Sequence, residues 1–309
     1  MMKRNILFDC DPGHDDIMAI LCALAHREEL NILGYTTVCG NNTLPSVTRN
    51  LLNVLSYLGQ PALIAEGCDN PLIGGPEVQD AHGKTGLDGF DFPEPTFETL
   101  KISAVEFMKE QIMQSKEPVT LVGMGPLTNL ALLIKSYPEV KKRIEEIVFM
   151  GGAIQGGNIL EHSEFNIYAD PIAAEIIAES HIPLVICPLE VCRDVSINEQ
   201  QINALKNAGY VSNMVYGLLD FYYGYARKHH MKETPVFDLC TILYLLYPEA
   251  FTGYACSLEV IPQGKTVRGM TVIEPQDDSC ITVLTHADKG LMEGFLQDIK
   301  KLDREVVQK

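Results

Sequence analysis

The sequence predicts an α/β fold, a Rossmann-like and mostly parallel central sheet flanked by helices. The first observation is an alternation of short apolar runs and amphipathic stretches between residues 5 and 187. Strands that alternate with helices are typical of parallel sheets covered on both faces. The second is that no repeat, low-complexity tract or Pro/Gly-rich linker divides the 309 residues. We therefore expect one domain over residues 1–309.

The N-terminal half supplies the alternation. In chain order we expect strand 5–10, helix 17–26, strand 30–38, helix 47–58, strand 118–122, helix 127–134, and strands 147–150 and 183–187. Asp15 and Asp16 mark the start of the first helix, because carboxylates in a first turn interact favourably with the helix dipole. The polar stretch 67–99 shows little periodicity, and loops of that length are usually functional or mobile.

The C-terminal part has a different pattern. Helices are expected at 211–226 and 239–247, strands at 256–261, 266–273 and 281–284, and a last helix at 289–302. Residues 228–233 form a second candidate flexible segment.

Charge and cysteine usage limit the partners and the compartment. With 24 basic and 41 acidic residues the formal charge is −17, which repels phosphate backbones and anionic lipid, so neither nucleic acid nor a membrane is expected as a partner. Asp9 interrupts the first apolar stretch too early for a signal peptide. The nine cysteines lack the CxxC spacing of zinc sites and several lie in apolar runs, which favours free thiols in a reducing cytoplasm.

Polar residues gather where the expected strands end. The first strand is followed by a run of carboxylates, the second by Gly40 and Asn41, the third by Met124 and the fourth, at Met150, by two glycines. In an open parallel sheet ligands bind beyond the carboxyl ends of the strands. We therefore expect these residues to meet on one rim.

Four carboxylates, Asp9, Asp11, Asp15 and Asp16, lie within eight residues. Such charges must protonate, spread into solvent or share a cation. Oxygen ligands of this kind suit calcium or magnesium. The alternative is a helix N-cap with spare surface acids. An EF-hand is excluded, because the required glycine and glutamate are missing and a strand precedes the loop.

The stretch Asp9-Cys-Asp-Pro-Gly-His-Asp-Asp16 resembles the N-terminal motif of inosine-uridine-type nucleoside hydrolases. Later blocks resemble that family in order and spacing, and together they cover essentially the whole chain: 36–41, 82–86, 125–129, 150–152 and 164–166. The resemblance implies hydrolysis of the N-glycosidic bond of ribonucleosides through an oxocarbenium-like transition state. It implies the nucleoside hydrolase fold, Ca²⁺ as cofactor, and a homo-oligomer, usually a dimer or tetramer.

The resemblance also implies residue roles. Asp11, Asp16, the Met124 carbonyl and Asp238 would hold Ca²⁺, and Asp11 would take a proton from a Ca²⁺-bound water that Asn41 helps to orient. Four residues would bind the hydroxyl groups of the sugar: Asp15 and Asn166 those of the ribose ring, and Asn158 and Glu164 the 5′-hydroxyl. Met150 would pack near the sugar, and Asp9 would support the metal ligands from behind. Read without the resemblance, Asn41 could be a turn residue and the two methionines core residues.

Phe237 departs from the family pattern. Many members carry His before the aspartate that corresponds to Asp238, where it is a proposed proton donor to the leaving base. Phenylalanine cannot donate a proton, but it can stack on a base. His82 is the next candidate acid, since histidine ordinarily titrates near neutrality, and His229 and His230 lie in a plausible lid segment.

Two other functions remain open. A haloacid-dehalogenase-like phosphatase also begins with a strand and Asp-x-Asp, but Gly13 stands where that fold expects Thr or Val. A nucleoside or ribose sensor on the hydrolase fold would bind without releasing ribose. The sequence leaves open whether purine or pyrimidine nucleosides are preferred.

Overall fold

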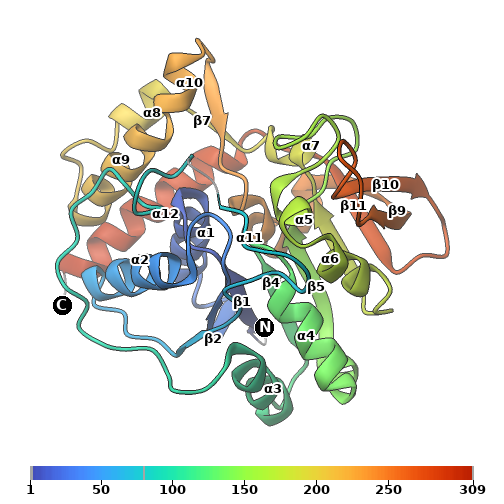
Figure 1. Ribbon diagram of the computed structural model, residues 1–309. Helices are drawn as coiled ribbons and strands as arrows, with labels where there is room; N and C mark the ends of the chain where they lie inside the picture. The colour runs from blue at the N-terminus through green and yellow to red at the C-terminus, as the bar shows by residue number, and fades with distance from the viewer. Residues whose placement is uncertain (1–2, 79–80, 308–309) are drawn as a thin grey trace.

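The computed structural model describes residues 3–78 and 81–307 and confirms the predicted fold class (Figure 1). Within this part, the main sheet has nine strands in the order β10-β9-β11-β6-β5-β4-β1-β2-β3. The strands are β1 (Arg4–Cys10), β2 (Leu30–Thr37), β3 (Ile64–Glu66), β4 (Val119–Gly123), β5 (Ile144–Met150), β6 (Leu184–Cys187), β9 (Phe251–Ile261), β10 (Met270–Pro275) and β11 (Ile281–Ala287). The seven neighbouring strands β11-β6-β5-β4-β1-β2-β3 pair in parallel, whereas β9 pairs antiparallel with both β11 and β10.

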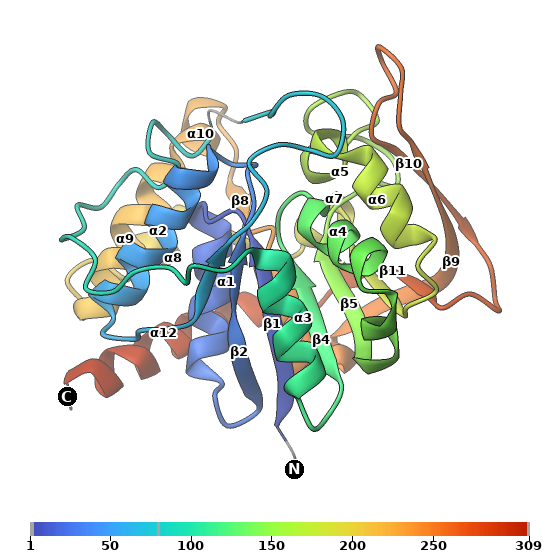
Figure 2. The same ribbon diagram turned by 60° about the horizontal axis from the view of Figure 1, so that its bottom comes forward.

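Helices cover both faces of the sheet, and Figure 2 shows the two layers on either side of β1 and β4. One layer holds α1 (His14–Ala25), α2 (Leu44–Tyr57), α9 (Tyr210–Tyr222), α11 (Leu239–Leu246) and α12 (Leu291–Val307). The other holds α3 (Ala104–Gln114), α4 (Thr128–Ser136) and α6 (Pro171–Ala178). Alternate residues of β1 enter opposite cores: Ile6 and Phe8 pack in the first and Leu7 in the second. Burial on both faces explains the near-continuous apolar runs of these strands.

Shorter elements complete the fold. They are α5 (Phe165–Ala169), α7 (Leu189–Cys192), α8 (Glu199–Asn203), α10 (Gly224–Lys228), the 3₁₀ helices Pro138–Arg143 and Pro248–Ala250, and an antiparallel pair of β7 (Ser196–Asn198) and β8 (Glu233–Pro235). No helix among residues 3–78 and 81–307 is long and apolar enough to cross a membrane.

Several elements differ from the sequence prediction. The strand expected at 266–273 begins only at Met270, because turns bounded by Gly264 and Gly269, both at positive φ, occupy the preceding residues. The helix expected at 211–226 breaks at Tyr223 and continues as α10. Helices α3 and α6 and the edge strand β3 are among the elements that were not predicted. The described residues of 67–99 contain no helix or ladder strand, as expected, and residues 79–80 lie outside the described part.

Candidate active site

The predicted rim exists: the carboxyl ends of β1, β2, β4 and β5 border a pocket of about 80 Å³. Ten residues singled out from the sequence line it, namely Asp15, Asn41, His82, Met124, Met150, Asn158, Glu164, Asn166, Phe237 and Asp238. Asp11 and Asp16 adjoin it through hydrogen bonds with Asn41. All the predicted site residues therefore meet in one place, although Asp238 comes from the far end of the chain, just before α11.

Asp11 is held in a fixed position at the end of β1. The backbone N–H of Asn41 donates to its Oδ2 at 2.6 Å, and the Asn41 side-chain amide donates to its carbonyl at 3.2 Å. The chain can pass this closely only because glycines flank the carboxylate. A Cβ on Gly40 would lie 2.0 Å from Asp11 Oδ2, and one on Gly125 would lie 2.8 Å from Asp11 Cγ.

Asp16 folds back over the strand end from the first turn of α1. Its carboxylate accepts from the backbone N–H groups of Asp11 at 3.2 Å and Gly13 at 2.9 Å, and from the Asn41 amide at 3.1 Å. These bonds satisfy free N–H groups at the helix start, where negative charge is also favoured by the dipole. Asp15, Asp16 and Asp238 each place an oxygen within 4.8 Å of the others.

The carboxylates raise one another's pKa. Burial and then the Asp16 charge raise the pKa of Asp11 well above its usual range. Burial and then Asp15 raise the pKa of Asp16 to about 7, and burial with Asp15 raises that of Asp238 well above normal. No ion pair among the described residues involves this cluster. The ionised form of the cluster therefore has no cation among the described residues to balance its charge.

Two buried oxygens in the cluster, Asp11 Oδ1 and Asp15 Oδ1, have no hydrogen-bond partner. Buried polar atoms are normally satisfied, so an unpaired oxygen beside three further carboxylates is suited to bind a positive ligand. A hard divalent cation fits this donor set. Asp9 differs from the other carboxylates, because its Oδ1 accepts from Thr36 Oγ1 at 2.6 Å and from Asn129 Nδ2 at 2.8 Å.

The opposite wall of the pocket is built around the start of α5. Glu164 caps this helix, accepting from the backbone N–H groups of Asn166 and Gly152 at 2.8 and 3.0 Å, and burial raises its pKa to about 7. The Asn166 amide donates to the carbonyls of Met124 at 3.3 Å and Met150 at 3.2 Å. These bonds fix the amide so that it faces the space between the carboxylates and Glu164.

Comparison with known proteins agrees with this arrangement. The model of the family described as inosine-uridine preferring nucleoside hydrolase matches residues 6–294. The chain belongs to this family. Pyrimidine-specific ribonucleoside hydrolases RihA from Citrobacter koseri and Shewanella baltica are each 43% identical to it, over 88% of this chain and 89% and 87% of theirs.

Solved nucleoside hydrolases have the same fold. The purine-preferring ribonucleoside hydrolase from Gardnerella vaginalis superposes with a TM-score of 0.89 at 25% identity, covering 99% of both chains. The plant nucleoside hydrolase PpNRh1 gives 0.88 at 26% identity, covering 98% of this chain and 99% of its own. The protein is therefore an enzyme that hydrolyses the N-glycosidic bond of ribonucleosides, which excludes the phosphatase and the non-catalytic sensor as its function.

The sequence predicted that His82 of this nucleoside hydrolase titrates near neutrality, and the structure contradicts this prediction. The ring is buried, which lowers its pKa to about 4, so it is neutral at pH 7. Its Nδ1 lies 3.0 Å from Nδ1 of His14 and 3.2 Å from the backbone N–H of the same residue. His229 and His230 are exposed and do not line the pocket.

Four residues of the hydrolase site were not predicted from the sequence. Tyr222, Ala81 and Phe165 line the pocket, and the His14 ring stacks against His82 and Tyr222 with centroids 5.2 and 5.5 Å apart. Tyr222 ends α9, where it follows the apolar spacing of a core residue and gives no separate signal. His14 lies inside the carboxylate motif, so only its position hinted at a role.

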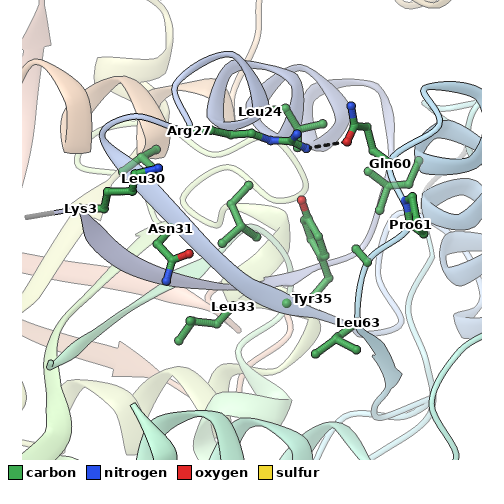
Figure 3. Close-up of a pocket in the computed structure, with 14 residues that line it drawn as sticks. Lys3, Leu24, Arg27, Leu30, Asn31, Leu33, Tyr35, Gln60, Pro61 and Leu63 are labelled. Carbon is green, nitrogen blue, oxygen red and sulfur yellow. Dashed lines mark hydrogen bonds between the residues drawn. The ribbon is translucent and has the colours of Figure 1, made fainter. Parts of the chain in front are cut away.

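A second pocket, of about 430 Å³, lies around the first half of β2 (Figure 3). Lys3, Arg27, Tyr35 and Gln60 are among its polar lining residues, and Arg27 donates to Gln60 across it at 3.0 Å. No carboxylate lines it. It therefore lacks the carboxylates that glycosidic hydrolysis requires. The candidate active site of the nucleoside hydrolase is the pocket at the carboxyl ends of β1, β2, β4 and β5.

Proposed function

We propose that this nucleoside hydrolase acts on pyrimidine ribonucleosides such as uridine and cytidine, with Ca²⁺ held by Asp11, Asp16, Asp238 and the Met124 carbonyl. The observation that carries the metal site is the buried, unpaired charge of the carboxylate cluster with its two unsatisfied oxygens. Calcium suits carboxylate and carbonyl oxygens in an irregular shell. When bound, the ion would contact the ribose diol and lower the pKa of a water molecule.

Asp11 is the proposed general base. Its Oδ2 accepts from the Asn41 backbone N–H, whereas its Oδ1 has no protein partner, so one lone pair of Oδ1 could face the ion and the other could accept a proton from water. A base held by a short hydrogen bond and by two flanking glycines is positioned before the substrate arrives. Asn41, which contacts both Asp11 and Asp16, would fix the water and the base relative to one another.

The sugar would bind between the carboxylates and α5. The free Oδ1 of Asp15 can accept from a ribose hydroxyl, and the Asn166 amide lies on the other side. Glu164 and Asn158, which cap and brace the start of α5, would bind the 5′-hydroxyl, and Met150 would pack against the ring. Negative charge around the ribose would stabilise the positive charge that develops on the sugar as the bond breaks.

The base would lie against Phe237 and His82, which share the pocket wall with Tyr222. We propose that His82 acts at the leaving base. Its neutral ring lies with Nδ1 3.0 Å from Nδ1 of His14 and 3.2 Å from the His14 backbone nitrogen. A preference for pyrimidines is supported by the similarity to the pyrimidine-specific ribonucleoside hydrolases, which are 43% identical to this chain.

The test is ribose release from uridine, cytidine, inosine and 2′-deoxyuridine, with wild type and Asp11→Ala, with and without chelator. We expect release from uridine and cytidine, loss in the variant and in chelator, and no release from the deoxynucleoside. Faster hydrolysis of inosine than of uridine would refute the base preference. Full activity after metal removal would refute the calcium site.

Three further proposals concern the whole chain. We propose that residues 1–309 form one folding unit, which a single calorimetric transition would support.

We propose that the protein is a homodimer or homotetramer. This proposal rests on the resemblance to the family, and light scattering tests it. We propose a cytoplasmic location, supported by seven buried free thiols among the described cysteines, and tested by cell fractionation.

A further inference from the structure

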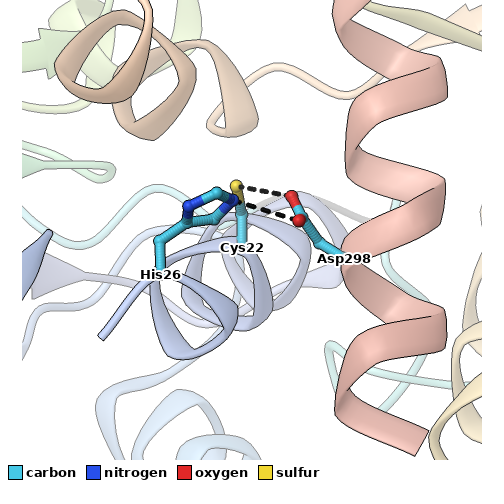
Figure 4. Close-up of side chains that lie close together, drawn as sticks. All are labelled: Cys22, His26 and Asp298. Carbon is cyan, nitrogen blue, oxygen red and sulfur yellow. Dashed lines mark hydrogen bonds and ion pairs between the residues drawn. The ribbon is translucent and has the colours of Figure 1, made fainter. Parts of the chain in front are cut away.

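A second cluster of ligand-type side chains lies at the far end of α1. Cys22, His26 and Asp298 bring a sulfur, an imidazole nitrogen and a carboxylate oxygen within 4.8 Å of one another. Figure 4 shows Cys22 and His26 on one side and Asp298 reaching them from α12. Asp16 and His26 are ten positions apart, ~15 Å along a helix axis, so this cluster is separate from the active site. We propose that these three side chains bind a divalent metal ion of the zinc type.

The spacing of the ligand atoms supports this proposal. Bond lengths to zinc of ~2.3 Å for sulfur and ~2.0 Å for nitrogen or oxygen, at tetrahedral angles, separate the ligands by roughly 3.3–3.6 Å. The Cys22 sulfur lies 3.8 Å from Asp298 Oδ2, and His26 Nε2 lies 3.0 Å from Asp298 Oδ1. Each of these distances is within about half an ångström of the tetrahedral value, but they join different oxygens, so the Asp298 carboxylate would rotate or bind the ion through both oxygens.

Charge and ligand type also fit zinc. A deprotonated Cys22 and an ionised Asp298 would neutralise a divalent ion, while His26 binds as a neutral ring. A thiolate with an imidazole selects a borderline metal such as zinc over calcium or magnesium. The second ring nitrogen, His26 Nδ1, lies 3.7 Å from the Glu29 carboxylate. Metal-binding histidines commonly direct that second nitrogen at a carboxylate, which orients the ring.

The same geometry argues against a nucleophilic cysteine. In a catalytic triad the histidine stands between the nucleophile and the acid. Here Asp298 stands between Cys22 and His26 and contacts both. Burial and then Asp298 raise the pKa of the Cys22 thiol well above normal, so the free thiol is not activated. The side chains of His26 and Asp298 are 12% and 14% exposed, which gives an ion a path and a water the fourth position.

A metal at this position would fasten α12 to α1. Both helices belong to the layer that covers one face of the sheet, and α12 is the last element of the chain. The full set of ligands exists only in the folded state, since they come from positions 22, 26 and 298, so the ion would bind that state more tightly. Zinc at a hundred times its Kd is therefore expected to raise the Tm by ~4 °C.

The experiment uses Co²⁺ as a spectroscopic probe on the reduced, calcium-saturated enzyme. We expect a thiolate-to-cobalt charge-transfer band in the near ultraviolet, which oxygen ligands in the active site cannot produce. The band should disappear in Cys22→Ser. In Asp298→Asn, half of the full band intensity should require at least a tenfold higher cobalt concentration. It should persist in the control Cys68→Ser. Zinc should displace cobalt and raise the Tm of the wild type but not of Cys22→Ser.

Two results would overturn the proposal. One is the absence of a charge-transfer band in the wild type at millimolar cobalt, which would leave the cluster a hydrogen-bonded contact between helices. The other is a band that survives in Cys22→Ser, which would assign the metal to another thiol. Circular dichroism and turnover of uridine check that Cys22→Ser is folded, because neither readout depends on the proposed zinc ligands.

Discussion

Gly40→Ala tests the placement of Asp11 with one added methyl group. The φ of Gly40 lies outside the left-handed region, so alanine causes no backbone strain there. Its Cβ, however, would lie 2.0 Å from Asp11 Oδ2 and 2.8 Å from Pro126 Cδ, where real contacts are essentially never under 3.0 Å. The carboxylate must therefore move by about 1 Å. A displacement of that size costs ~10²-fold in rate, or about 2.7 kcal/mol of transition-state stabilisation.

The assay is the initial rate of uridine hydrolysis, with the Tm measured in parallel. We expect kcat/KM to fall ~100-fold in Gly40→Ala. Gly125→Ala should cause a smaller fall, since its Cβ would lie 2.8 Å from Asp11 Cγ. Gly294→Ala is the matched control, because nothing lies within 4 Å of that Cβ. A kcat/KM within threefold of wild type for Gly40→Ala, at an unchanged Tm, would show that the position of Asp11 does not limit catalysis.

Three further perturbations have defined outcomes. Asp238→Asn removes one charge from a mutually repelling cluster, so the metal-free variant should melt at or above the wild-type temperature at pH 8 but gain nothing from Ca²⁺; a wild-type response to Ca²⁺ would exclude Asp238 as a ligand. Burial raises the pKa of Glu164 from 4.5 to about 7, so its contribution to folding is complete below pH 4.5 and is lost as the pH rises through about 7. The Tm of the metal-free protein should fall across this range and fall less in Glu164→Gln; parallel curves would contradict that assignment. His82→Ala should lower turnover of uridine by at least ~10²-fold, and His82→Gln, which keeps a donor, should lose less; near wild-type turnover in His82→Ala would remove this residue from the mechanism.

The sheet and its rim were predictable from sequence for one physical reason. Strands buried on both faces leave apolar runs, and the polar residues that follow such runs lie at the carboxyl edge. Asp11, Asn41 and Met124 all follow runs of this kind. Asp238 does not follow a strand, and its apolar neighbours in the sequence indicated only that a buried carboxylate there needs a partner.

The missed features have different causes. Helix α3 carries an N-terminal signal, since Ser103 caps it and Glu106 stands three residues later, but it follows the long polar stretch and its apolar face is short. Tyr222 becomes a pocket residue only through the packing of α9. The lowered pKa of His82 depends on burial by residues distant in sequence, which no local pattern reports.

The position of β11 in the sheet has a consequence for synthesis of the chain. This strand begins at Ile281, yet it lies between β6 and β9 and pairs with both. Until it leaves the ribosome, β6 is an open edge and the β9–β10 hairpin has no neighbour in the main sheet. Exposed edges of apolar strands invite pairing with other chains, and N-terminal parts of a chain fold first. A nascent chain that stalls before Ile281 should therefore expose the unpaired edge of β6, which can pair with other chains. Variants truncated before Ile281 should aggregate rather than fold into a smaller hydrolase.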